Sequence, residues 1–108
     1  MATTVRATRI HVRYPLDRNP SHVVLRTAHG QFVGVVSNLS THGVGLIVDA
    51  WLPPGTEVVT QLSNSCKLYA CDLGMRVVHC SEQTNGMYVI GCEFISPLPH
   101  ETVRALVR

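Results

Sequence analysis

The chemistry in this sequence is concentrated in two short stretches whose side chains suit anions and nucleobases. Arg9 and Arg13 lie four residues apart, so they share one side of either a helix or an extended strand. Each guanidinium offers a planar fork of N–H donors that fits phosphates and the edge of guanine. Downstream, Asn38 supplies an amide, Ser40 a hydroxyl, and Gly43 lets a flat ring approach the backbone. Together the two stretches could hold a doubly anionic ligand that carries bases.

The other polar residues indicate neither an enzyme nor a metal site. The seven carboxylates are scattered, and the six histidines show no pair spaced by four residues, as a metal-binding helix would have. No glycine-rich phosphate loop precedes a helix, and Ser40 lacks the strand–turn–helix context of a nucleophile elbow. We therefore expect no catalytic residue, no metal ligand and no cofactor.

Length and charge set the class of protein. A chain of 108 residues corresponds to one domain. The N-terminus has no hydrophobic signal segment, and no apolar run approaches the roughly 20 residues of a membrane-spanning helix. We expect a cytoplasmic protein without membrane insertion. The net charge of +2 is uneven: residues 1–30 carry five arginines and one aspartate, whereas four basic and six acidic residues follow.

The four cysteines are predicted to be small buried hydrophobic residues. No two of them have the spacing of a zinc or redox motif, and a disulfide is disfavoured in a chain without a secretion signal. They are Cys66, Cys71, Cys80 and Cys92.

A small β-barrel is predicted to position the two stretches. Residues 1–21 form an irregular arm, because Pro15 and Pro20 interrupt any helix. Residues 38–43 form a tight corner whose backbone N–H groups and polar side chains face outward. The predicted β-runs cover residues 22–27, 31–37, 44–48, 56–62, 67–73, 75–80 and 87–94. At Gly74 either a bulge bends one strand or two strands meet.

One short helix follows the strands. Residues 100–108 carry an apolar stripe, and Pro99 suits the first helical position. A helix this short must pack on the β structure to be stable. Six or seven short strands and a final helix suggest an antiparallel barrel, which removes exposed edges by closing. Trp51 is predicted to cover one end of it.

The order of these features resembles the PilZ domain family, whose signature is RxxxR followed by [D/N]xSxxG. Residues 9–13 and 38–43 match these motifs, and residues 43–46, 52–58, 76–78 and 88–94 resemble further segments of the family pattern. The resemblance implies a six-stranded antiparallel β-barrel over residues 22–108 with a C-terminal helix, preceded by a flexible arm over residues 1–21. It also implies a bacterial receptor for cyclic di-GMP.

The resemblance assigns roles to five residues. Arg9 and Arg13 would grip guanine edges and phosphates, whereas Asn38, Ser40 and Gly43 would contact the other guanine and the ribose–phosphate ring. Ligand would order the arm over the barrel, and the new shape would signal to a protein effector.

Two positions depart from the usual family pattern. Thr8 stands where many members carry an additional arginine, which leaves the ligand stoichiometry open. Some members place an aromatic residue after the segment corresponding to residues 76–78. His79 occupies that region here and is a candidate for stacking on a guanine.

Two alternatives remain. A PilZ-like module that binds proteins and not nucleotide would usually lack the two arginines. A barrel that binds single-stranded nucleic acid needs aromatic platforms and a basic groove. Here aromatic residues make up 6% of the chain and the strand region is net acidic, so we expect no DNA or RNA partner.

Overall fold

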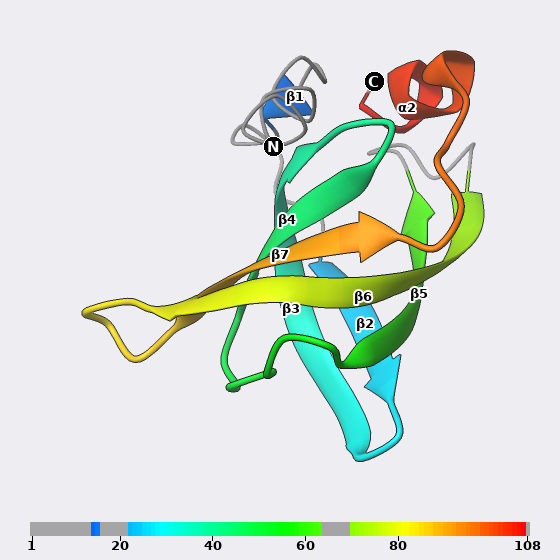
Figure 1. The fold of residues 1–108 in the computed structure, drawn as a ribbon. Coiled ribbons are helices and arrows are strands. Elements are labelled where there is room, and N and C mark those ends of the chain that lie inside the picture. The colour runs from blue at the N-terminus through cyan, green and yellow to red at the C-terminus, as the bar shows by residue number, and fades with distance from the viewer. Residues whose placement is uncertain (1–13, 16–21, 64–69, 108) are drawn as a thin grey trace, which may run out of the picture.

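The computed structural model describes residues 14–15, 22–63 and 70–107 (Figure 1). Within these ranges the chain forms seven strands and one helix. They are β1 (Tyr14–Pro15), β2 (His22–Thr27), β3 (Gly30–Leu39), β4 (Gly43–Val48), β5 (Glu57–Ser63), β6 (Ala70–Glu82), β7 (Tyr88–Phe94) and α2 (His100–Leu106).

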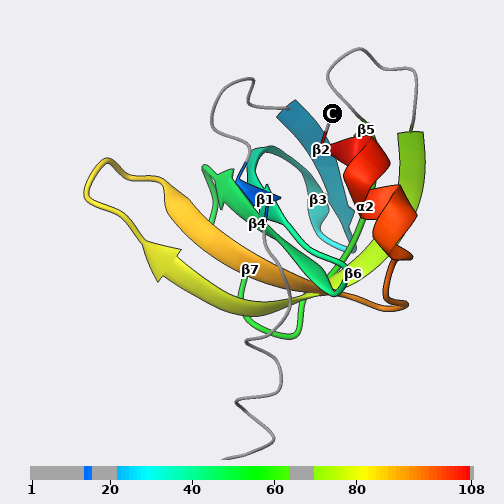
Figure 2. The ribbon, with the colours of Figure 1, turned by 90° about the horizontal axis from the view of Figure 1, so that it is seen from above.

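Strands β2 to β7 close into a six-stranded antiparallel barrel, which confirms the predicted fold (Figures 1 and 2). The strands follow the order β3-β2-β5-β6-β7-β4, and the pairing of β3 with β4 completes the ring. The short strand β1 pairs with the end of β3, at Asn38 and Leu39, beyond the part of β3 that pairs with β2. The β6–β7 hairpin projects beyond the barrel wall (Figure 2).

The core forms because apolar residues alternate along each strand. In β7 the residues Ile90, Cys92 and Phe94 are buried, as the predicted alternation requires. In β5 the buried positions are Val58, Thr60 and Leu62. Aliphatic side chains from every strand of the barrel fill the space between the walls.

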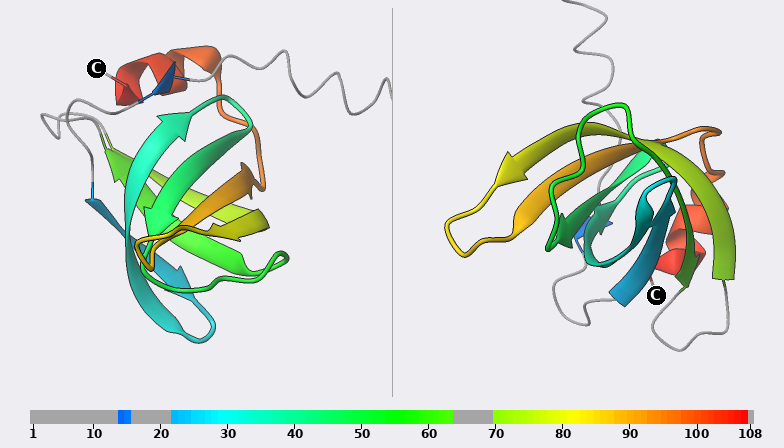
Figure 3. Two further views of the ribbon diagram at one scale, coloured as in Figure 1. Left: turned by 90° about the vertical axis from the view of Figure 1, so that its left-hand side faces the viewer. Right: turned by 90° about the horizontal axis from the view of Figure 1, so that it is seen from below.

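Helix α2 lies across one end of the barrel, the same end as β1, whereas the β2–β3 turn lies at the other (Figures 1 and 3). It buries Val103 and Leu106. Pro99 is the N-cap of this helix rather than its first helical residue, which corrects the predicted position by one residue. No helix in the described ranges has the length and apolar character needed to cross a bilayer.

The weakest junction of the barrel lies between β2 and β5. These strands share a single register pair, Arg26 with Val59, whereas β5 pairs with β6 along the whole length of β5. The hydroxyl of the buried residue Thr60 donates a hydrogen bond of 2.7 Å to the carbonyl of Val24. The Thr60 side chain therefore links β2 to β5 where few backbone hydrogen bonds join the two strands.

Several boundaries differ from the sequence prediction. Strand β6 runs without a break through Gly74, and its register shift lies between Val77 and His79. Strand β3 extends to Leu39, so Asn38 belongs to a strand rather than to the corner. Tyr14 and Pro15, in the arm predicted to be irregular, form β1.

In the loop between β4 and β5, the predicted Pro-Gly turn is present, but Trp51 does not pack as predicted. Gly55 has φ +96°, and the N–H of Thr56 bonds to the carbonyl of Pro53 at 3.1 Å, as in the predicted Pro-Gly turn. Trp51 is 54% exposed and does not close the barrel end. Its ring meets that of Tyr88 edge to face, with centroids 6.1 Å apart.

Candidate functional site

Ser40 holds the β3–β4 corner together from the inside. It is only 1% exposed, and its hydroxyl oxygen accepts hydrogen bonds from the N–H groups of His42 and Gly43, at 3.3 and 3.2 Å. Its own N–H donates to the carbonyl of Gly43 at 2.9 Å. For the Ser40 hydroxyl and the N–H groups of His42 and Gly43, the prediction that the corner groups face outward is therefore wrong. They satisfy one another and fix the shape of the turn.

Gly43 is required by the barrel itself. A side chain at this position would run into the backbone carbonyl of Cys92 on β7, because Gly43 is paired there with Glu93. The glycine lets β4 approach β7 closely where the corner begins. The close approach that the structure shows at Gly43 is thus between protein backbones, and the predicted contact of Gly43 with a ligand stays a prediction.

Asn38 presents its amide on the outer face of the barrel. A register shift after Val36 pairs Asn38 with Gly45, and Ser37 lies in the shift. The missing side chain of Gly45 leaves room for the amide, whose nitrogen and oxygen lie 2.9 and 3.0 Å from the place a Cβ would take. The Asn38 amide also donates to the hydroxyl of Ser37 at 3.3 Å.

Four residues form a cross-strand row on this face, which we call the glycine row. Asn38 on β3 pairs with Gly45 on β4, Gly45 pairs with Gly91 on β7, and Gly91 pairs with His79 on β6. A Cβ at Gly91 would collide with the imidazole, so the His79 ring covers Gly91 as the Asn38 amide covers Gly45. The row spans three strand spacings of about 4.8 Å.

The chemistry of the glycine row suits a planar, polar ligand. The Asn38 amide has both donors and an acceptor, and the exposed imidazole of His79 offers an aromatic face and a ring nitrogen. Gly45 and Gly91 lie between these two side chains and, having no side chains of their own, do not project from the barrel surface. On one side the neighbouring row is apolar, with Ile47 paired to Val89.

Strand β1 connects the glycine row to the arginine segment. Tyr14 pairs with Leu39 and Pro15 pairs with Asn38. Arg13 immediately precedes Tyr14 in the sequence. Arg9 and Arg13 themselves lie outside the described residues, and their predicted roles stay predictions.

The described cysteines behave as hydrophobic residues. Burial raises the pKa of the Cys92 thiol to about 12, with a further contribution from Cys80. Burial and the neighbouring carboxylate of Asp72 raise the pKa of Cys71. All three thiols are free, and Cys66 lies outside the described residues. Among the described residues, no group of three histidine, cysteine or acidic side chains could hold a metal ion.

The sequence motif identified Asn38 as a candidate site residue but did not identify Gly45 and Gly91, which lie in the same cross-strand row. Both glycines occupy outward positions between buried neighbours, which is the pattern expected where another group approaches a strand closely. That signal is visible in the sequence. The alignment of these glycines with Asn38 and His79 depends on the register of four strands, and the sequence does not show that register.

Comparison with known proteins agrees with this architecture. Residues 7–108 match the PilZ domain family, a range that includes both the arginine segment and the barrel. A search of the curated proteins gave no significant match. The family match covers nearly the whole chain, and the barrel has the strand order and final helix described above. The protein therefore belongs to the PilZ domain family.

Proposed function

We propose that this domain is a cyclic di-GMP receptor that passes ligand binding to a protein effector. The observation that carries the proposal is the pairing of Tyr14 and Pro15 with Leu39 and Asn38. It brings the chain directly after the RxxxR motif to the strand that carries the second motif. The family match supports the same ligand class.

In the proposed complex the two arginines bind phosphates and a guanine edge, and the barrel binds the other guanine. Arg9 and Arg13 supply charge-assisted forks. Asn38 supplies hydrogen bonds, and His79 supplies a stacking face above Gly91. Ser40 and Gly43 contribute by fixing the corner and the approach of β4 to β7.

Ordering of the arm links binding to signalling in this proposal. Residues 1–13 precede β1, and fixing their backbone costs about 1–2 kcal/mol per residue. Two arginine clamps on a dianion offset part of that cost only when ligand is present. The arm then presents a new surface to the effector, and the domain carries no catalytic step.

Calorimetric titration of the purified domain with cyclic di-GMP tests the proposal. The intact domain should bind saturably, and an Arg9→Ala/Arg13→Ala variant should lose binding while keeping its circular dichroism spectrum. An Arg104→Ala variant, which removes an exposed arginine on α2, is the matched control and should bind normally. Absence of binding by the intact domain would reject the receptor function.

A further inference from the structure

An apolar stripe crosses the wall of the barrel opposite the glycine row. Four of the exposed large hydrophobic residues belong to it: Val24, Val33, Val59 and Ile95, with exposures of 40, 54, 55 and 57%. Val33 pairs with Val24, and Val59 pairs with Gly74. Ile95 covers Gly74, approaching within 3.5 Å of the place a Cβ would take. We call these four residues, with Arg26 in their middle, the valine stripe.

The valine stripe is separate from the candidate nucleotide site. The stripe follows β3, β2, β5 and β6, whereas the glycine row follows β3, β4, β7 and β6. Because the barrel closes in the order β3-β2-β5-β6-β7-β4, these are opposite walls. A partner on one wall leaves the other wall accessible.

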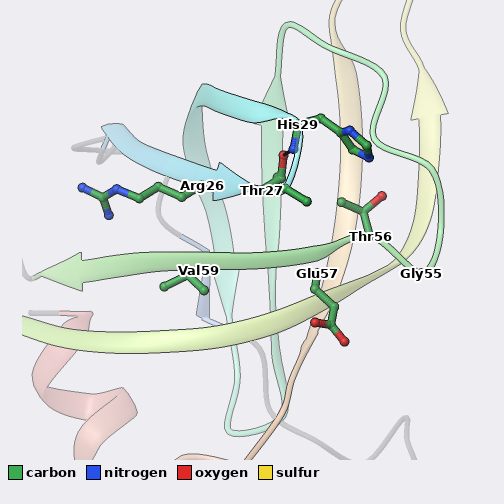
Figure 4. Close-up of a pocket in the computed structure, with 8 residues that line it drawn as sticks. Arg26, Thr27, His29, Gly55, Thr56, Glu57 and Val59 are labelled. Carbon is green, nitrogen blue, oxygen red and sulfur yellow. Dashed lines mark hydrogen bonds between the residues drawn. The ribbon is translucent and has the colours of Figure 1, made fainter.

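Arg26 places a positive charge at the centre of the stripe, and none of its register partners among the described residues is a carboxylate. Its register neighbours are Gln31 on β3 and Val59 on β5. By contrast, Arg76 on β6 is paired with a glutamate on each side, Glu57 and Glu93. Figure 4 shows the Arg26 side chain extending away from that of Glu57. Arg26 is therefore a cation set among exposed aliphatic side chains.

The stripe borders an open groove of about 660 Å³, which Arg26 and Val59 also line (Figure 4). Its other walls are the β2–β3 turn, including His29, the loop that carries Thr56, and Glu57 at the start of β5. Both the apolar stripe and the groove are thus available to one bound molecule. The surface offers apolar contact, a central cation and a recess.

The charges around the valine stripe indicate which class of molecule binds it. The arm of this chain carries four arginines and one aspartate, so it would be repelled by Arg26. A second copy placed around a two-fold axis at the stripe centre would bring Arg26 against its own counterpart. The carboxylates of Glu57 and Asp72 flank the stripe on the outer faces of β5 and β6, which disfavours an extended anionic membrane surface. Because Arg26 extends away from Glu57, a single carboxylate at the centre of the stripe can meet Arg26 without meeting Glu57 (Figure 4).

We propose that the valine stripe is the docking surface for a different protein, one that presents apolar side chains around a central carboxylate. Arginine within an apolar patch is typical of protein interfaces, where it anchors a partner's acidic group. This proposal deepens the effector part of the proposed function. Nucleotide binding is tested by a separate titration, so failure of the docking surface leaves the receptor function standing.

Photo-crosslinking in the organism that supplies the sequence tests the proposal with the full chain. A benzophenone amino acid replaces Val59, and in a control it replaces Val78, an equally apolar residue that is 49% exposed outside the stripe. We expect position 59, and not position 78, to crosslink to one protein at a peptide with an acidic residue among apolar ones. Crosslinks to a second copy or to lipid, equal yields at both positions, or no product at position 59 would overturn the proposal.

The crosslinked protein, once purified, provides a second and quantitative readout. Arg26→Glu and Val59→Asp should each weaken its affinity at least about tenfold, whereas Val78→Asp should not. Changing the partner's acidic residue to arginine should restore binding to the Arg26→Glu variant. Arg26→Gln, which preserves size on an exposed strand position, guards against misfolding, and thermal melting confirms that each variant folds. Unchanged affinity in folded Arg26→Glu and Arg26→Gln proteins would contradict the assigned role.

Discussion

Pro15 is paired with Asn38 across β1 and β3, so the chain shortly after the RxxxR motif lies beside the first residue of the second motif. Residues before Tyr14 carry the arginines, and residues from Asn38 onward carry the corner. The pairing means that a ligand held by the arginines and a ligand held by the glycine row are expected to be the same molecule.

The stability of the junction between β2 and β5 should depend on the hydroxyl of Thr60. Thr60→Val keeps the shape of the side chain but removes the donor to the Val24 carbonyl. Where only one backbone pair joins the strands, we expect a loss of about 1–3 kcal/mol in the free energy of unfolding, measured by urea denaturation. Thr56→Val, which removes a similar bond at an exposed turn, should cost less than about 1 kcal/mol. Equal losses of stability in Thr60→Val and Thr56→Val would contradict this role of Thr60 at the junction.

The corner should reject any side chain at Gly43. Gly43→Ala places a methyl group against the carbonyl of Cys92, and overpacking of this kind costs about 1–3 kcal/mol. Gly74→Ala is the control, because its methyl would meet only Ile95 at an ordinary contact of 3.5 Å. Denaturation of both variants measures the difference. A Gly43→Ala protein as stable as the Gly74→Ala protein would contradict the close approach of β4 to β7.

His79 and Gly91 should act as one unit in ligand binding. Removing the ring in His79→Ala should weaken cyclic di-GMP binding by about 1–3 kcal/mol if the ring stacks on a base. Gly91→Ala should cause a similar loss, because the added methyl displaces the ring that covers this glycine. The double variant should be little worse than either single one. Fully additive losses in calorimetry would separate Gly91 from His79.

The Cys92 thiol should make stability fall at alkaline pH. Its folded pKa is raised from an ordinary value of 9.0 to about 12, so between these values the unfolded chain loses a proton that the folded chain keeps. The free energy of unfolding should drop by up to about 1.4 kcal/mol per pH unit in that window and be unaffected below it. Urea denaturation at about pH 8 and about pH 10 should show a larger drop in the intact protein than in Cys92→Val. Equal drops would place the thiol in a more solvated environment.

Local rules in the sequence accounted for most of the fold. Alternation of apolar residues identified β2, β4 and β7 within a residue of their ends, and the Pro54-Gly55 turn followed from the φ preferences of its two residues. The sequence left two possibilities open at Gly74, one bent strand or two strands, because the pairing of β6 with β5 and β7 that decides between them involves residues distant in the sequence. The same reason explains Trp51, whose exposure depends on where Tyr88 lies.

The candidate site was less accessible to sequence reasoning than the fold. The motif residues could be recognised, but their assignment as direct contacts could not distinguish Ser40, which is buried and bonded to the turn, from Asn38, whose amide lies on the outer face. The alignment of Asn38 with His79 depends on register shifts in both β3 and β6. A shift of one residue in either strand would turn one side chain away from the row.

The most direct test of a single site is a double-mutant cycle on cyclic di-GMP affinity between Arg13 and Asn38, measured by calorimetry. Arg13→Ala and Asn38→Ala remove one group from the arm and one from the barrel. If both groups contact one ligand, the double variant should depart from the sum of the single losses by about 0.5–3 kcal/mol. Strictly additive losses in folded variants, or no binding by the intact domain, would contradict a single site formed by Arg13 and Asn38.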